Sequence, residues 1–294
     1  KMKDITVLIP VHTIEGNFNE WFDKAIKSIQ ENTLKPEKVA IIHCDCEDVK
    51  SFMESYDFGE LDVEFIINEG DLDFCSQINY GVSQVKTTWF SILEFDDEYS
   101  TIWFKNVEKY KDSYNKTSIF LPLVVDVDEA GQFLSFTNEA LWAMKFSDKL
   151  GFLDNTALLN YQNFQTSGMA MKKEDFETIG GFKSSMKLTF VYEFLLRATY
   201  NDLQVMTIPK VGYKHTNMRV ESLFWDYKNH TSDKLMPEEA KFWMDTAKKE
   251  YFFKMDRKVK YDDRTSGGEI KNVSIDSTGG VVKEVQPKTE EEAK

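Results

Sequence analysis

The chain has 294 residues, of which 41% are hydrophobic and 14% aromatic, which is enough for a large core and excludes a disordered protein. Its formal net charge is −14, so the general nucleic-acid binders, which need a basic surface to displace counterions, are also excluded. An acidic protein that handles an anionic nucleotide needs a local positive charge, and a bound cation would supply one.

Strands and helices alternate in the first third of the chain. Short, apolar, β-branched runs predict buried parallel strands, and the apolar residues between them recur at helical spacing. The predicted strands cover 5–9, 39–42, 63–67 and 89–93, and the predicted helices cover 74–86 and the residues after Asn17, which we expect to cap its helix. This succession predicts an α/β fold with a Rossmann-like, mostly parallel sheet flanked by helices.

The second half of the chain is less regular. We predict strands at 119–125, 132–136, 167–171 and 205–208, the last of them stopped by Pro209, and helices around Phe176, at 190–200 and at 237–253. Large apolar residues become rare from Asp262 onward. We therefore expect an α/β domain at 1–220, a C-terminal helical extension at 221–261 and a flexible polar tail at 262–294.

The three cysteines, Cys44, Cys46 and Cys75, fall mostly within predicted core segments. We interpret them as buried thiols of a protein in a reducing compartment, without a disulfide framework, and we predict a cytoplasmic location. No apolar run approaches the roughly 20 residues of a membrane span, so we expect no transmembrane segment and no signal peptide.

An acidic loop, Glu94-Phe95-Asp96-Asp97, directly follows the fourth predicted strand. Ligands of open α/β sheets bind beyond the carboxyl ends of the strands, where this loop lies. Carboxylates crowded in this way are unfavourable unless a positive charge neutralises them, and a hard cation that bridges to a diphosphate would do so. The alternative is a solvated acidic turn; the buried strand before the loop favours the metal site.

Five segments, in the right order, resemble those of glycosyltransferase family 2 and its GT-A relatives between about Ile5 and Asn217. Each segment alone is a weak signal, but chance matches do not keep their order. The segments are Ile9-Pro10-Val11-His12, Asn68-Glu69-Gly70 with Ile78-Asn79-Tyr80-Gly81-Val82, Leu93-Glu94-Phe95-Asp96-Asp97, Gly180-Gly181-Phe182 and Tyr213-Lys214-His215-Thr216-Asn217.

The resemblance implies a GT-A fold and transfer of a sugar, with inversion, from a UDP-linked donor to a hydroxyl of a glycan, protein or lipid acceptor. It also implies a bound Mn²⁺ or Mg²⁺ that stabilises the leaving nucleoside diphosphate. The implied metal ligands are Asp96, Asp97 and His215, and the implied donor-binding residues are Pro10, Val11, His12, Asp45, Asn79 and Glu94.

The chain departs from the family at the catalytic base. The family has an acidic pair at the start of a helix that ends Leu-Leu-Arg, and here Phe190 and Val191 stand at that pair. Glu193 is the nearest acid and our candidate for the base that takes the acceptor proton. Glu193 and Arg197 are four residues apart, so a helix-surface ion pair is an equally good interpretation.

Two other functions remain open. The missing acidic pair suggests a catalytically inactive GT-A scaffold that acts as a binding or structural protein. A metal-dependent nucleotidyltransferase also places acidic ligands after a strand, but it would carry a glycine-rich basic loop after its first strand. Residues 11–16 contain one glycine and no lysine or arginine, which disfavours that enzyme class.

Overall fold

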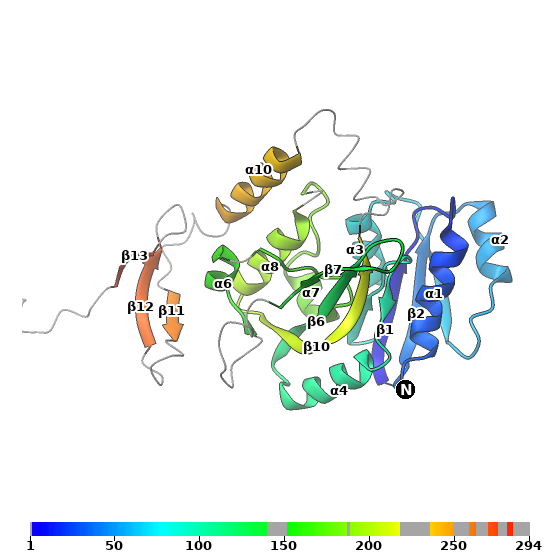
Figure 1. Cartoon of the computed structure of the whole chain (residues 1–294), viewed down its shortest axis with the longest axis horizontal. Helices are drawn as coiled ribbons and strands as arrows, with labels where there is room; N and C mark the ends of the chain where they lie inside the picture. Colours follow the sequence, from blue (N-terminus) through cyan, green and yellow to red (C-terminus); the bar gives the residue numbers. More distant parts are fainter. Residues whose placement is uncertain are drawn as a thin grey trace, which may run out of the picture.

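The computed structural model describes residues 2–139, 152–160, 162–186, 189–217, 236–249, 259–262, 270–275 and 281–284. A ten-stranded mixed sheet forms its centre, in the order β3-β2-β1-β4-β9-β6-β10-β5, with β7 paired to β6 and β8 to β10 (Figure 1). The strands are β1 (Met2–Pro10), β2 (Pro36–His43), β3 (Val63–Ile67), β4 (Trp89–Ile92), β5 (Glu98–Tyr99), β6 (Thr117–Val127), β7 (Phe133–Thr137), β8 (Phe152–Leu153), β9 (Ala170–Lys172) and β10 (Gln204–Thr216).

The parallel half of the sheet, β3-β2-β1-β4, confirms the predicted strand arrangement. β1 pairs in parallel with both neighbours, and Leu8 lies opposite Ala40 on β2 and Ile92 on β4. From Ile5 to Pro10 nearly every β1 residue is shielded from solvent, as a β-branched apolar run covered on both faces requires. All four carboxyl ends therefore meet at one edge of the sheet.

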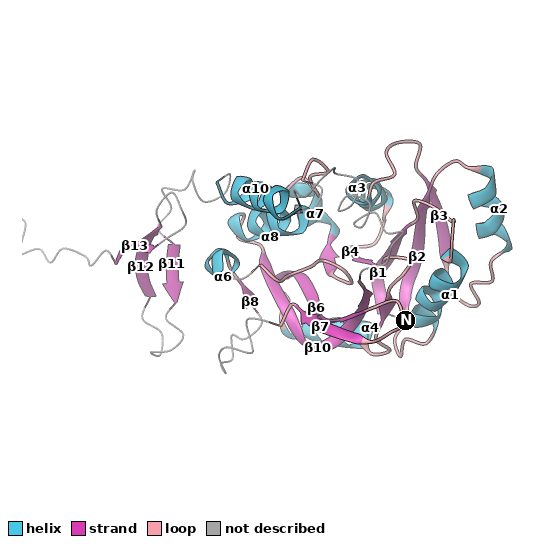
Figure 2. Ribbon diagram, turned by 45° about the horizontal axis from the view of Figure 1, so that its top comes forward, coloured by secondary structure: helices cyan, strands magenta, loops and turns pink. Residues whose placement is uncertain are grey.

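Helices cover both faces of the sheet (Figure 2). One layer contains α3, α7 and α8, and the opposite core cluster contains residues of α1, α2 and α4. The helices of the described chain are α1 (Phe18–Gln30), α2 (Glu47–Ser55), α3 (Phe74–Gln84), α4 (Trp103–Ser113), α6 (Asn155–Asn160), α7 (Lys173–Thr178), α8 (Phe190–Tyr200) and α10 (Met236–Lys248). Within the described residues, no helix has both the length and the apolar character needed to cross a bilayer.

The start of α1 differs from the prediction in one detail. Its predicted apolar face is buried, but the Asn17 side chain makes no capping hydrogen bond. The backbone carbonyl of Asn17 instead accepts from the N–H groups of Glu20 and Trp21. The helix therefore owes its position to the burial of Phe18 and Phe22 rather than to a side-chain cap.

Two predicted strands have different bounds in the structure. We expected Pro209 to stop its strand, but β10 continues to Thr216 through a register shift between Ile208 and Val211. The proline is exposed at this irregularity, where no ladder hydrogen bond from its nitrogen is required. We also expected a strand from 167, but β9 begins at Ala170, because Gly168 has a φ of +76° and turns the chain.

The C-terminal part also departs from the prediction. α10 packs against the α8 side of the core, where Ala247 is fully buried, and this agrees with a helical extension. However, β11 (Val259–Asp262), β12 (Ile270–Ile275) and β13 (Val281–Glu284) form an antiparallel sheet. β12 and β13 are strands within the predicted polar tail, and β11 lies at the end of the predicted helical extension. The polar composition averaged over the predicted tail did not reveal short strands such as β12, in which Ile270, Val273 and Ile275 are β-branched. Residues 221–235 and 250–258 of the predicted extension lie outside the described residues.

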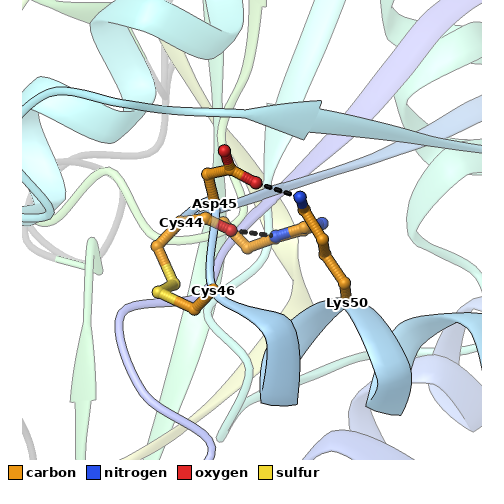
Figure 3. The surroundings of a disulfide bond; sticks show 5 residues. Cys44, Asp45, Cys46 and Lys50 are labelled. Carbon is orange, nitrogen blue, oxygen red and sulfur yellow. Dashed lines mark hydrogen bonds and ion pairs between the residues drawn. A yellow bond between two sulfur atoms is a disulfide. The ribbon is translucent and has the colours of Figure 1, made fainter.

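The cysteine prediction is also wrong in part. A disulfide joins Cys44 and Cys46 in the loop after β2 (Figure 3), whereas Cys75 is free and buried, as expected. A cysteine pair separated by one residue does not match the spacing of the known disulfide frameworks, so the sequence pattern did not reveal it. The disulfide removes the reduced thiols from the argument for a cytoplasmic location, which stays a prediction.

Candidate functional site

The candidate site lies at the carboxyl edge of the parallel strands. The Leu93 N–H donates to the Leu8 carbonyl at 2.9 Å, and the Val11 N–H donates to the Ile42 carbonyl at 2.8 Å. These bonds bring the chain after β4, β1 and β2 to one edge of the sheet. The acidic loop therefore begins where the sequence predicts a ligand site.

Two acidic side chains of this loop meet a histidine from the far end of β10. His215 Nδ1 lies 3.0 Å from Asp97 Oδ2 and 3.9 Å from Glu94 Oε2. One potential ligand atom from each of the three residues lies within 4.8 Å of the others. The structure thus brings together two of the three predicted metal ligands, Asp97 and His215, with Glu94, which was predicted to bind the donor.

Asp97 is the most enclosed member of the cluster. Its carboxylate is fully buried and accepts three hydrogen bonds: from the Tyr213 hydroxyl at 2.8 Å, from the Thr216 N–H at 2.8 Å and from His215 Nδ1 at 3.0 Å. Donors on three residues of one strand therefore hold this carboxylate against β10, and in turn Asp97 holds the His215 ring in one orientation.

Glu94 is the more open carboxylate, with 29% of its side chain exposed. Its Oε2 accepts the Ser167 hydroxyl proton at 2.7 Å, and its backbone N–H donates to the Tyr213 hydroxyl at 3.1 Å. Burial, followed by the charges of Asp97 and Asp96, raises the pKa of Glu94 to about 8. Glu94 is therefore easily protonated near neutral pH when no cation is bound.

His215 carries the positive charge of the cluster. Burial by itself would lower its pKa, but the carboxylate of Asp97, its hydrogen bond and the charge of Glu94 together raise the pKa to about 10. The imidazolium is therefore the stable form at neutral pH. This corrects one premise of the sequence argument, because the neutralising charge is already available within the chain and does not require a metal.

The donor atoms nevertheless suit a divalent cation. Carboxylate oxygens are the ligands that Mg²⁺ and Mn²⁺ prefer, and imidazole adds a donor that favours Mn²⁺ over Mg²⁺. Asp97 holds Nδ1 of His215, which leaves Nε2 as the ring nitrogen for a metal, the usual carboxylate–histidine–metal arrangement. Asp96 is half-buried in the same loop, and its charge contributes to the raised pKa of Glu94.

Solved structures of S. aureus TarS, a GT-A glycosyltransferase, are similar to this chain. TarS 1-349 matches with a TM-score of 0.60 and 12% identity over 86% of this chain and 66% of that one. Its complex with UDP-GlcNAc matches with a TM-score of 0.60 and 14% identity, over 86% of this chain and 68% of that one. The longer TarS structure matches with a TM-score of 0.54 and 14% identity, over 90% of this chain and 46% of that one.

The chain has the GT-A fold. Because the chain spans only 66% of TarS 1-349 and 46% of the longer structure, the similarity concerns the shared domain. No protein-family model matches the sequence, and no curated protein matches it either.

The predicted nucleotide residues of the GT-A domain lie at the expected edge, with differing exposure. Pro10 and Val11 are buried, whereas His12 is half-buried, with its ring 5.5 Å from that of Phe95. Asp45 is exposed in the disulfide loop and pairs with Lys50. These four predicted donor contacts thus flank the acidic loop from the ends of β1 and β2.

Asn79 links two segments of the fold, and its predicted contact with the donor stays a prediction. Its side-chain amide donates to the Phe182 carbonyl at 2.8 Å and accepts from the Phe182 N–H at 2.9 Å. The two bonds join α3 to the loop after Gly181, which is close enough that an added Cβ would meet Asn79 Oδ1 at 2.6 Å. Asn79 is therefore a structural link between two segments that the resemblance singled out separately.

Glu193 is fully buried, so the interpretation as a helix-surface ion pair is wrong. The pair itself exists: Arg197 donates from Nε and Nη2 to the two Glu193 oxygens, each at 2.9 Å. Lys183 Nζ also lies 3.4 Å from Glu193 Oε1. Both oxygens of the Glu193 carboxylate therefore already have cationic partners, and an acceptor hydroxyl would have to displace one of them.

Sequence reasoning missed three residues that shape the site. Tyr213 bridges Asp97 and Glu94, and it belongs to the His215 segment, so the resemblance contained the signal. Ser167 and Gly168 lie in a stretch that we expected to be a strand. Gly168 accommodates the Tyr213 ring, since an added Cβ would lie 2.5 Å from its Cδ2 atom.

Proposed function

We propose that the chain is a glycosyltransferase that transfers a sugar, with inversion, from a UDP-linked donor to an acceptor hydroxyl. The observation that carries this proposal is the cluster of Glu94, Asp97 and His215 at the carboxyl edge of a GT-A fold. The UDP-GlcNAc complex of TarS supports a nucleotide-sugar donor. Glycan, protein and lipid hydroxyls all remain candidate acceptors.

The donor would lie along the edge formed by the ends of β1, β2 and β4. Pro10, Val11 and His12 would contact the nucleotide from the first loop, and Asp45 would contact the nucleoside from the second. The negative charge of a diphosphate is repelled by the carboxylates of the acidic loop, so the protonated His215 or a cation is needed beside it.

Glu94, Asp96 and His215 would hold a divalent cation, Mn²⁺ or Mg²⁺, and Asp97 would orient His215 through Nδ1. A bound cation would stabilise the charge that gathers on the leaving diphosphate. Loss of a proton from His215 and from Glu94 must accompany metal binding, because the pKa values of both groups are raised in the metal-free protein.

The proposed function is tested by the release of UDP. Purified protein with manganese and a panel of UDP-sugars should release free UDP slowly, and Asp96→Asn should reduce the rate at least about 100-fold. Glu98→Gln is the matched control: it removes the same charge directly after the acidic loop, at the start of β5, but Glu98 pairs with Lys214 at 2.6 Å. Equal rates for the Asp96 variant and the native protein would remove Asp96 from the metal site.

A second function, an inactive GT-A scaffold that binds nucleotide, is favoured by the burial of Glu193 against Arg197. Glu193 acts as the base only if this ion pair opens when the acceptor binds. Calorimetry with UDP and manganese separates the two functions, since a scaffold would bind the nucleotide without releasing UDP from any UDP-sugar. Absence of both binding and release would reject both functions.

A further inference from the structure

The Cys44–Cys46 disulfide is placed where it does little to hold the fold. It closes a loop with a sequence separation of 2, and in the chain-entropy model the stabilisation from a cross-link grows with the length of the loop. β2 and α2 on either side are already fixed, because Ile42 is part of the buried sheet and Val49 and Met53 are buried in the core. A structural cross-link would join distant segments.

The surroundings favour exchange with an external thiol. Both cysteines are half-buried rather than enclosed, so a small thiol can approach them. Cys46 is the residue before the first turn of α2, where the helix N–H groups stabilise a thiolate. Lys50 lies one turn further along and pairs with Asp45 between the two cysteines, so its charge is balanced by that carboxylate, and Glu47 and Asp48 stand in the first turn of the same helix (Figure 3).

The same loop lies beside the proposed donor site. Cys44 and Cys46 pack against the core cluster that contains Val11 from the β1 loop and Phe95 from the acidic loop. The His43 carbonyl also accepts the Asn68 N–H at 2.8 Å, which ties the end of β2 to the end of β3. The cysteine loop begins two residues after Ile42, whose carbonyl accepts the Val11 N–H of the first proposed donor loop at 2.8 Å.

We propose that Cys44 and Cys46 form a thiol–disulfide exchange site that sets the affinity of the chain for the donor nucleotide. This inference rests on the proposed function. A dithiol reductant attacks one cysteine sulfur as a thiolate, the Cys44–Cys46 bond breaks, and the other cysteine leaves as a thiolate that takes up a proton. The second thiol of the reagent then releases the first cysteine, so that two electrons and two protons pass to the protein.

The disulfide form is the one that binds the nucleotide more tightly. The closed loop holds Asp45 in a narrow range of positions at the mouth of the site, whereas the dithiol form must lose this freedom when the nucleotide binds. The restriction of one side chain on binding corresponds to about a fivefold weaker affinity for UDP in the reduced protein.

Two measurements on the whole chain test the proposal. Equilibration with reduced and oxidised dithiothreitol, followed by alkylation and mass spectrometry, reports the state of the pair without any nucleotide. Calorimetry with UDP and manganese then compares both states. The Cys44→Ser, Cys46→Ser double variant should bind UDP like the reduced protein in either buffer. Cys75→Ser, at the buried cysteine away from the loop, should keep the redox response of the native chain.

A pair that resists reduction in the folded protein would overturn the proposal, and so would equal UDP affinities of the oxidised and reduced forms. Absence of UDP binding in both forms would instead overturn the proposed function on which the inference rests, while the mass measurement still decides whether the pair exchanges. Thermal unfolding of the double variant should remain close to that of the native chain, because the loop is too short to contribute much stability.

Discussion

Replacement of Tyr213 by Phe should remove hydrogen bonds of the candidate site without changing the packing of the core. The ring stays in place, but two hydrogen bonds are lost: the hydroxyl no longer donates to Asp97 at 2.8 Å or accepts from the Glu94 N–H at 3.1 Å. A hydrogen bond to a charged group contributes about 1.5–3 kcal/mol, and an unpaired buried N–H costs about 1–3 kcal/mol. We therefore expect Tyr213→Phe to reduce the free energy of unfolding by about 3 kcal/mol.

Urea denaturation measures this loss, and Tyr99→Phe is the matched control. Tyr99 is also buried, and its ring packs on that of Tyr213 at 5.6 Å, but its hydroxyl pairs only with the neutral Ser91 hydroxyl. Ser91 keeps a second partner, the Gly168 carbonyl at 3.2 Å, so the control should lose about 1 kcal/mol. Manganese affinity should fall in the Tyr213 variant alone. If both variants lose the same stability, Tyr213 does not hold the acidic loop.

The remaining predictions concern the charges and the packing of the same site. The pKa of His215 is raised to about 10, so its contribution to the free energy of unfolding is complete below pH 6.5 and is lost as the pH rises toward 10. The pKa of Glu94 is raised to about 8, so its contribution is lost as the pH rises from 4.5 to 8. Urea midpoints of the metal-free protein should therefore fall with rising pH, and a His215→Gln variant whose fall above pH 6.5 is as steep as the native one would contradict this. Gly168→Ala should cost about 2 kcal/mol more than Gly131→Ala in thermal unfolding, because both glycines have a positive φ but only the first would place a Cβ against Tyr213; equal costs would show that the ring can move aside.

Much of the fold could be predicted because the patterns are local. The apolar runs at 5–9, 39–42, 63–67 and 89–93 match β1 to β4 closely. The central strands β1, β2 and β4 are buried on both faces and must be apolar along the covered length, whereas the edge strand β3 is apolar although Phe65 and Ile67 are exposed. The acidic loop was predictable for the same reason, as it directly follows one of these runs. Patterns that depend on distant partners were less informative, and Pro209 was misread because an irregular ladder tolerates a proline.

The amino-acid sequence on its own determined where the parallel strands lie along the chain and the position of Glu94, Asp96 and Asp97 at the end of the fourth one. Only the tertiary structure decided which groups meet these carboxylates. Tyr213 and His215 are more than a hundred residues away from the acidic loop and reach it because β10 pairs with β5, the strand that directly follows this loop. Whether an acidic side chain meets a cation, a hydroxyl or solvent depends on the packing between strands, which the residues next to it in the chain do not determine.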